Sequence, residues 1–146
     1  MTEPGLEQST TAHTQWARDA YAKAKQQHPG LTSYGFDLPR GTDYLDDWAE
    51  GISTKHALEI HRAACWLDGM ETVKHPDRFG SCGLKHSAER WAGAYVREGA
   101  LIVAALALGV PIKPYGRQGH GAHIGVSAAA VVRRRQEAAE RRSSDD

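Results

Sequence analysis

The chain has 146 residues, of which 40% are hydrophobic and 25% are charged, and this composition suits one globular domain with its own core. Its 18 basic residues balance its 18 acidic residues, which excludes a strong overall attraction to nucleic acid or to anionic membranes. Two cysteines are too few for the disulfide framework of a small secreted protein. We therefore expect a single helical domain over residues 1–146 whose charged contacts are local.

The beginning of the chain has no basic segment followed by an apolar segment, the pattern of a secretory signal. The most apolar run, 100–110, would span about 16 Å as a helix, against roughly 30 Å of hydrocarbon in a bilayer. We expect a cytoplasmic protein that makes no membrane contact.

Helical periodicity begins near the amino terminus. Ser9, Thr10 or Thr11 can cap a helix whose apolar stripe holds Trp16 and alanines 12, 17, 20 and 24, and which His28-Pro29-Gly30 ends. Glycines and prolines predict a surface loop or an extended segment over 29–41, and a short helix is expected over 43–50.

Two further helices follow in the middle of the chain. Ser53 or Thr54 can cap the first, which ends at Gly69 and has Ala57, Ile60, Ala64 and Leu67 at three-and-four spacing. After a loop over 70–80, Ser81 can cap the second, whose apolar positions are Leu84, Ala88, Trp91, Ala92 and Tyr95.

Residues 100–108 are apolar on all sides, which predicts a central helix that the others surround. A loop over 111–125 and a last helix over 127–142 follow, the latter with Ala128, Val131, Val132 and Ala139 on its buried face. The predicted fold is therefore all-α, an irregular bundle of five to six helices, with 1–8 and 143–146 frayed.

Four residues form two pairs with ligand spacing, His61-x3-Cys65 and Cys82-x3-His86. Imidazole nitrogens and thiolates are ligands of tetrahedral zinc, so two adjacent helices could share one ion through these pairs. No other cofactor is predicted. The alternative is that Cys65 and His61 border the core as packing residues. A separate hypothesis is that Cys82 acts as a nucleophile, because a helix start favours a thiolate, and the alternative to it is an unreactive cysteine.

Acid and base chemistry is a second hypothesis. His86 and Glu89 are close enough on one helix to share a proton, and His61 and Glu59 on the preceding helix could complete a hydrolase or nuclease site. A solvated helix face explains the same residues without any chemistry.

Basic residues gather near the carboxy terminus. The last predicted helix has three more arginines than glutamates, and such a patch can bind phosphates. Its arginines are Arg133, Arg134, Arg135, Arg141 and Arg142. The alternative is a solvated helix end, where positive side chains suit the helix dipole. Arg117 lies in the preceding glycine-rich segment, 116–125, which lacks the Gly-Lys-Ser/Thr of a nucleotide-binding loop. A helix-turn-helix over 87–108 is excluded because its second helix has no side chain that can bind bases or phosphates.

The block RFGSCGLKHSAERW, residues 78–91, is followed by Tyr95-Val96 and the apolar run from Gly99 to Gly109. This pattern, which covers about a third of the chain, resembles a group of small uncharacterised proteins carried by phages and other bacterial mobile elements. The resemblance implies a bacterial accessory protein and transfers no catalytic residue.

Together these patterns favour a non-enzymatic accessory protein that binds a macromolecule, either nucleic acid through the carboxy-terminal arginines or a host protein through an exposed helix face. The alternative is a small hydrolase or nuclease that uses His61, His86 and Glu89, with or without zinc. A structural zinc protein is the third hypothesis.

Overall fold

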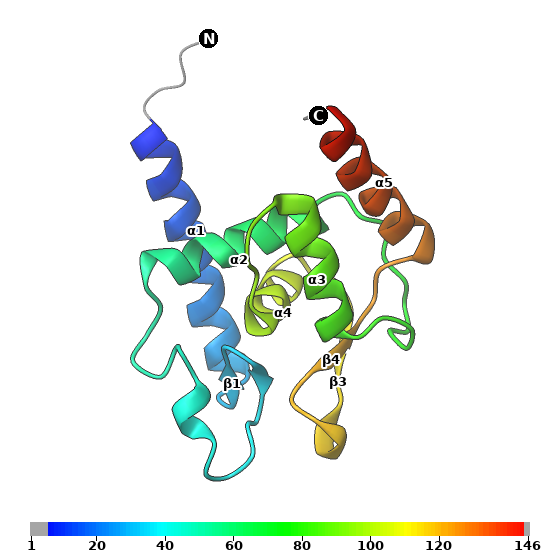
Figure 1. The fold of residues 1–146 in the computed structure, drawn as a ribbon. Coiled ribbons are helices and arrows are strands. Elements are labelled where there is room, and N and C mark those ends of the chain that lie inside the picture. The colour runs from blue at the N-terminus through cyan, green and yellow to red at the C-terminus, as the bar shows by residue number, and fades with distance from the viewer. Residues whose placement is uncertain (1–5, 145–146) are drawn as a thin grey trace.

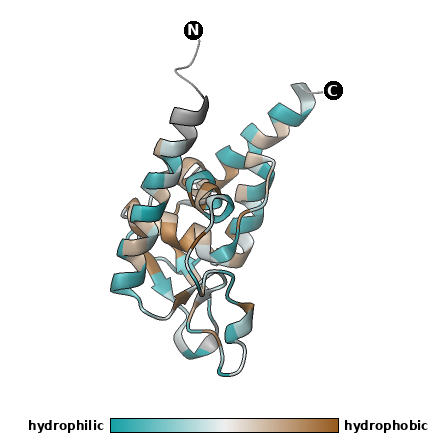
Figure 2. Ribbon diagram, turned by 90° about the vertical axis from the view of Figure 1, so that its left-hand side faces the viewer, coloured by the Kyte–Doolittle hydropathy of each residue, from teal (hydrophilic) through white to brown (hydrophobic). Residues whose placement is uncertain are grey.

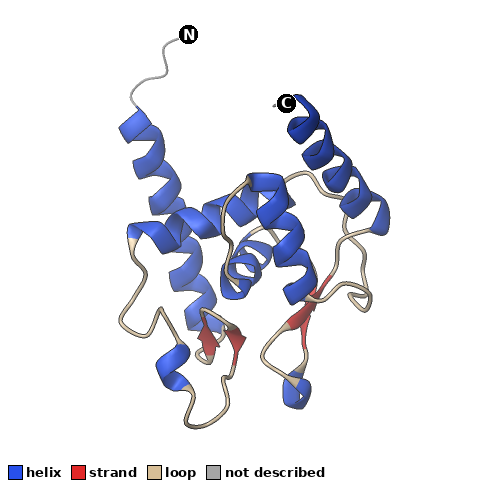
Figure 3. Ribbon diagram, in the orientation of Figure 1, coloured by secondary structure: helices blue, strands red, loops and turns tan. Residues whose placement is uncertain are grey.

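The computed structural model describes residues 6–144 and is rich in helix, with two small antiparallel hairpins (Figures 1 and 3). The predicted all-α fold is therefore correct only in its helical part. The α-helices are α1 (Leu6–Gln27), α2 (Thr54–Leu67), α3 (Ser81–Ala92), α4 (Glu98–Ala107) and α5 (Ala128–Ser144). The strands are β1 (Leu31–Thr32), β2 (Gly35–Phe36), β3 (Ile112–Pro114) and β4 (Ala122–Ile124), and the two 3-10 turns are η1 (Asp43–Leu45) and η2 (Gly116–Gln118).

Helix α4 is the centre of the molecule, as its apolar composition predicts. Every residue from Gly99 to Ala105 is buried, and α1, α2 and α3 all pack against this helix. In Figure 2 the hydrophobic segments accordingly lie in the interior, while the two long outer helices are mostly hydrophilic. A helix that is hydrophobic on all sides is stable only when its neighbours remove every face from water.

Helices α1 and α2 pack on each other and on α4. Helix α1 begins at Leu6, earlier than the predicted caps at 9–11, and it buries Ala17 and Ala24. Residues 6–8 thus belong to a helix, although we expected them to be frayed, and residues 1–5 lie outside the described part. The prediction for α2 is confirmed, because Ser53 Oγ accepts a hydrogen bond from the backbone N–H of His56 at 3.2 Å.

Helix α3 differs from its prediction at both ends. Gly80 is the N-cap, and Ser81 is the first helical residue, with its hydroxyl donated to Glu98 on α4 at 2.5 Å. The helix ends at Ala92 because Gly93 takes a left-handed conformation with φ 72°, so Tyr95 belongs to the connection that follows.

A buried ion pair fixes that connection to α2. Glu59 is only 1% exposed, and its carboxylate accepts hydrogen bonds from the Arg97 backbone N–H at 3.0 Å and from Arg97 Nη1. Arg97 Nε also donates to Asp47 at 2.9 Å. A buried carboxylate without a partner strongly destabilises a fold, so the pairing with Arg97 is what allows Glu59 to be buried here.

The first hairpin lies in 29–41, predicted as a loop or an extended segment, and the second lies in 111–125, predicted as a loop. They are joined by a hydrogen bond of 2.6 Å from the Phe36 N–H to the carbonyl of His120. Gly35 has φ 123° beside this contact, and a Cβ there would lie 2.2 Å from the same carbonyl oxygen. Strands of two or three residues are too short to show a period of two in the sequence, which is why the prediction missed them.

Two other segments also differ from their predictions. The expected helix over 43–50 is reduced to the turn η1, and the expected loop 70–80 is held by isolated bridges from Thr72 to Val126 and from Gly80 to His123. None of the helices in residues 6–144 is both long enough and apolar enough to cross a membrane.

Candidate nucleic-acid interface

Helix α5 carries all five arginines predicted near the carboxy terminus. It begins after Ser127, whose hydroxyl accepts a hydrogen bond from the Ala130 N–H at 3.1 Å, and it continues to Ser144. Its buried residues are Ala130, Val131 and Ala138, so the predicted buried face is correct only for Val131. Val132 is 49% exposed because the helix is rotated so that Arg134 and Glu137 pack at the interface in its place.

Arg134 attaches α5 to the end of α2. Its Nε donates to the carbonyl of Trp66 at 2.9 Å, and its Nη2 donates to the carbonyl of Asp68 at 2.6 Å. Its Nη1 pairs with Glu137 at 2.9 Å. The last carbonyls of a helix have no partner within that helix, so one guanidinium here satisfies two groups that water or another donor would otherwise have to satisfy.

Arg141 attaches α5 to the end of α3 in a similar way. Its Nη1 donates to the Trp91 carbonyl at 2.7 Å, and its guanidinium carbon lies 4.5 Å from the centre of the Trp91 ring. The guanidinium of Arg134 lies 4.9 Å from the same ring. We call Arg134 and Arg141 the arginine clamp, because they hold α5 on α2 and α3 through carbonyls and one aromatic ring.

The other three arginines of α5 are exposed. Within residues 6–144, Arg133, Arg135 and Arg142 make no side-chain hydrogen bond and no ion pair, so their guanidinium donors are available to a partner. Arg117 is also exposed, but it lies in η2, and this turn and the carboxy-terminal end of α5 are at opposite ends of the molecule (Figure 1). The predicted basic residues therefore fall into three groups. Arg134 and Arg141 form the arginine clamp, and Arg117 lies apart in η2. Arg133, Arg135 and Arg142 are exposed on α5 without a partner among the described residues.

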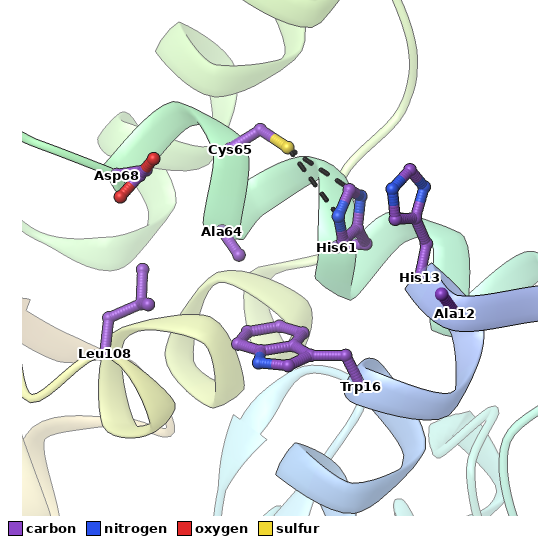
Figure 4. Close-up of a pocket in the computed structure, with 8 residues that line it drawn as sticks. All are labelled: Ala12, His13, Trp16, His61, Ala64, Cys65, Asp68 and Leu108. Atoms are coloured by element: carbon purple, nitrogen blue, oxygen red, sulfur yellow. Dashed lines mark hydrogen bonds between the residues drawn. The ribbon is translucent and has the colours of Figure 1, made fainter. Parts of the chain in front are cut away.

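His61 and Cys65 line a cleft of about 320 Å³ between α1, α2 and the end of α4 (Figure 4). The His61 ring stacks on His13 with centroids 3.8 Å apart, and Cys65 Sγ lies 3.7 Å from His61 Nδ1. Burial lowers the pKa of His61, and the charge of a protonated His13 lowers it further. Burial, followed by the charge of Asp68, raises the pKa of Cys65, so this pair favours a neutral imidazole and a thiol over a reactive thiolate.

His86 and Glu89 lie on α3 and do not line this cleft. His86 Nδ1 is 3.3 Å from Glu89, whose other oxygen accepts from Lys85 Nζ at 2.8 Å. Burial raises the pKa of Glu89, but the hydrogen bonds from Lys85 and from the Val96 N–H outweigh it and hold the pKa below its usual value. Glu89 is thus a structural carboxylate that positions the connection after α3.

The residues predicted to bind zinc are not brought together. His61 pairs with Cys65 in the cleft, whereas His86 pairs with Glu89 and Cys82 is exposed at the start of α3. In the described part of the chain, no three His, Cys, Asp or Glu side chains are close enough to hold one metal ion. The geometric reason is that His61 turns toward α1. The residues predicted to act as acid and base are also separated, since His61 lies in the cleft and His86 and Glu89 lie outside it.

A polar cluster that the sequence analysis missed joins α3, α4 and the second hairpin. Ser81 Oγ donates to Glu98 and accepts from the Ala122 N–H at 3.0 Å, while Glu98 Oε1 is 3.7 Å from His120 Nε2. Gly121 fits only because it has no Cβ, which would lie 2.6 Å from Glu98. Ser81 is fully buried and its hydrogen bonds are satisfied, so the cluster holds the hairpin in place. No local sequence signal links these distant residues.

Comparison with known protein families, curated proteins and solved structures finds no match to this chain.

Proposed function

We propose that the protein binds nucleic acid through Arg133, Arg135 and Arg142 on α5. The observation that supports this function is the division among the arginines. Two of the five are used to hold the helix, and the remaining three present guanidinium groups that have no partner among the described residues. Guanidinium groups bind phosphate oxygens with two parallel hydrogen bonds, which makes exposed arginines effective at phosphate contacts.

The local charge of α5 also favours an anionic partner. Glu137 is paired with Arg134 inside the interface, so it offsets little of the field of the exposed arginines. Glu140 is the one exposed carboxylate in the described part of α5, and the exposed arginines, which include Arg141, exceed it by three positive charges. The whole chain is neutral, so this surplus acts only at short range.

The test is a titration of a fluorescein-labelled 30-base-pair duplex, followed by fluorescence anisotropy, at salt concentrations from 50 to 200 mM. Each phosphate contact contributes about 0.9 to the slope of log K against log salt, so three contacts weaken binding about 40-fold over this range. The triple variant Arg133→Ala/Arg135→Ala/Arg142→Ala should lose that dependence and bind weakly at every salt concentration.

A matched control removes the same charge elsewhere. Lys23, Arg40 and Lys55 are exposed and lie outside α5, so the variant Lys23→Ala/Arg40→Ala/Lys55→Ala should retain the wild-type slope. Equal loss of binding in both triple variants would mean that net charge, and not the α5 surface, determines binding. Unchanged affinity of the α5 variant would exclude the proposed function.

A further inference from the structure

The outer side of α5 has an ordered arrangement of side chains. Successive residues of an α-helix are rotated by about 100°, so Val132, Gln136, Ala139 and Ser143 form one row on the side opposite the buried Ala130, Val131 and Ala138. We call these four residues the outer row. All four are exposed, and three of them are uncharged residues no larger than valine. A surface can therefore approach this side of the helix closely.

The exposed arginines lie on the two sides of the outer row. Arg133 is rotated about 100° from Val132 in one direction, while Arg135 and Arg142 lie on the other side of the row. The row is about 16 Å long at 1.5 Å per residue. Helix α5 packs chiefly on α3 and stands at the edge of the molecule (Figure 1). The outer row lies opposite the buried residues of α5 and is exposed.

These features have the dimensions and charges of a helix in the major groove of DNA. The groove is about 12 Å wide and admits one α-helix, with a phosphate backbone on each side and base edges at its floor. Arginines on both sides of a row of small side chains match that arrangement, because each side faces a different backbone. A single-stranded ligand has one backbone and no groove, and it would use only one of the two sides.

We propose that α5 binds in the major groove of double-stranded DNA, with the outer row toward the bases and Gln136 as the residue that reads one of them. The proposal rests on the proposed function and adds to it the kind of nucleic acid and a specificity residue. A glutamine amide can donate to N7 and accept from N6 of adenine at the same time, which defines adenine as its preferred base.

Glu140 is the acidic group that faces the same surface. It lies on the Arg133 side of the outer row, rotated by about 40° from Gln136 and by about 20° from Arg133. Because a carboxylate repels phosphates, the side of the row with Arg133 should contact its backbone more weakly than the side with Arg135 and Arg142.

The first experiment compares a 30-base-pair duplex of mixed sequence with each of its separated strands in the anisotropy assay at 100 mM salt. The duplex should bind more tightly than either strand. Equal or tighter binding of the strands, with loss in the Arg133→Ala/Arg135→Ala/Arg142→Ala variant, would overturn the groove proposal and leave the proposed function standing. Absence of binding to both forms would exclude the proposed function itself.

The second experiment selects preferred sites from a pool of random duplexes and measures the affinity of Gln136→Ala for the selected duplex. This variant should lose about five- to 150-fold in affinity for that duplex and little for the unselected pool. Replacing the preferred adenine by 7-deazaadenine should cause a similar loss in the wild type and almost none in Gln136→Ala. Gln26→Ala, a change of an exposed glutamine on α1, should have no effect. A wild-type preference that survives in Gln136→Ala would refute the assignment of this residue.

Discussion

The arginine clamp predicts that neighbouring arginines of α5 have opposite effects when each is replaced. Arg134 donates to two carbonyls of the α2 terminus, stacks on Trp91 and pairs with Glu137. We take about 1 kcal/mol for each carbonyl hydrogen bond, because water can rehydrate these carbonyls after truncation. The ring contact adds about 0.5–1 kcal/mol and the ion pair a few tenths. Arg134→Ala should therefore lower the free energy of unfolding by about 3 kcal/mol.

Urea denaturation followed by circular dichroism measures this loss directly. In a thermal unfolding assay it should appear as a decrease of roughly 6–12 °C in Tm for a chain of this size. Arg134→Lys keeps the charge but loses the planar arrangement of donors, so it should recover less than half of the stability. Arg135→Ala is the matched control, and its stability should stay within about 0.5 kcal/mol of the wild type. A decrease of less than about 0.5 kcal/mol in the free energy of unfolding of Arg134→Ala would refute the claim that Arg134 holds α5 on α2.

Two further predictions concern the core of the fold. Burial, and then the charge of His13, lower the folded pKa of His61. Its contribution to stability is therefore complete above about pH 6.5 and is lost as the pH falls through that value, where the unfolded chain takes up the proton first. His61→Gln should make the loss of stability between pH 7 and pH 5 smaller in urea titrations, and an unchanged profile would contradict this origin. Gly99→Ala should destabilise by about 1–3 kcal/mol, because its Cβ would lie 2.3 Å from the Thr32 carbonyl oxygen. Gly83→Ala, in α3 with open space around it, should instead stabilise by up to about 1 kcal/mol in the same thermal unfolding assay, and equal effects of the two changes would contradict the close packing at Gly99.

The helices could be predicted from the sequence where one face is uniformly apolar. The central position of α4 follows from its composition, and the beginning of α2 follows from the capping side chain of Ser53. Ser81 was predicted as a cap because it precedes an amphipathic run, but the hydroxyl binds Glu98 on α4 instead. A tertiary partner decides between these two uses of a serine, and its position is not visible from local spacing.

The sequence also could not show which residues of the candidate site are available to a partner. The surplus of arginines near the carboxy terminus is evident in the sequence, but all five look alike there. Only packing distinguishes Arg134, which lies against Trp91, from Arg135, which is exposed. The pairing of His61 with His13 depends in the same way on how α1 crosses α2, and it separates His61 from the other predicted site residues.

The measurement that tests the central claim most directly is the salt dependence of duplex binding for the wild type and for Arg133→Ala/Arg135→Ala/Arg142→Ala. We expect the slope of log K against log salt to fall by about one unit for each arginine that contacts a phosphate, up to about three. The Lys23→Ala/Arg40→Ala/Lys55→Ala protein should keep the wild-type slope. An unchanged slope in the α5 variant would contradict the assignment of this helix as a nucleic-acid interface.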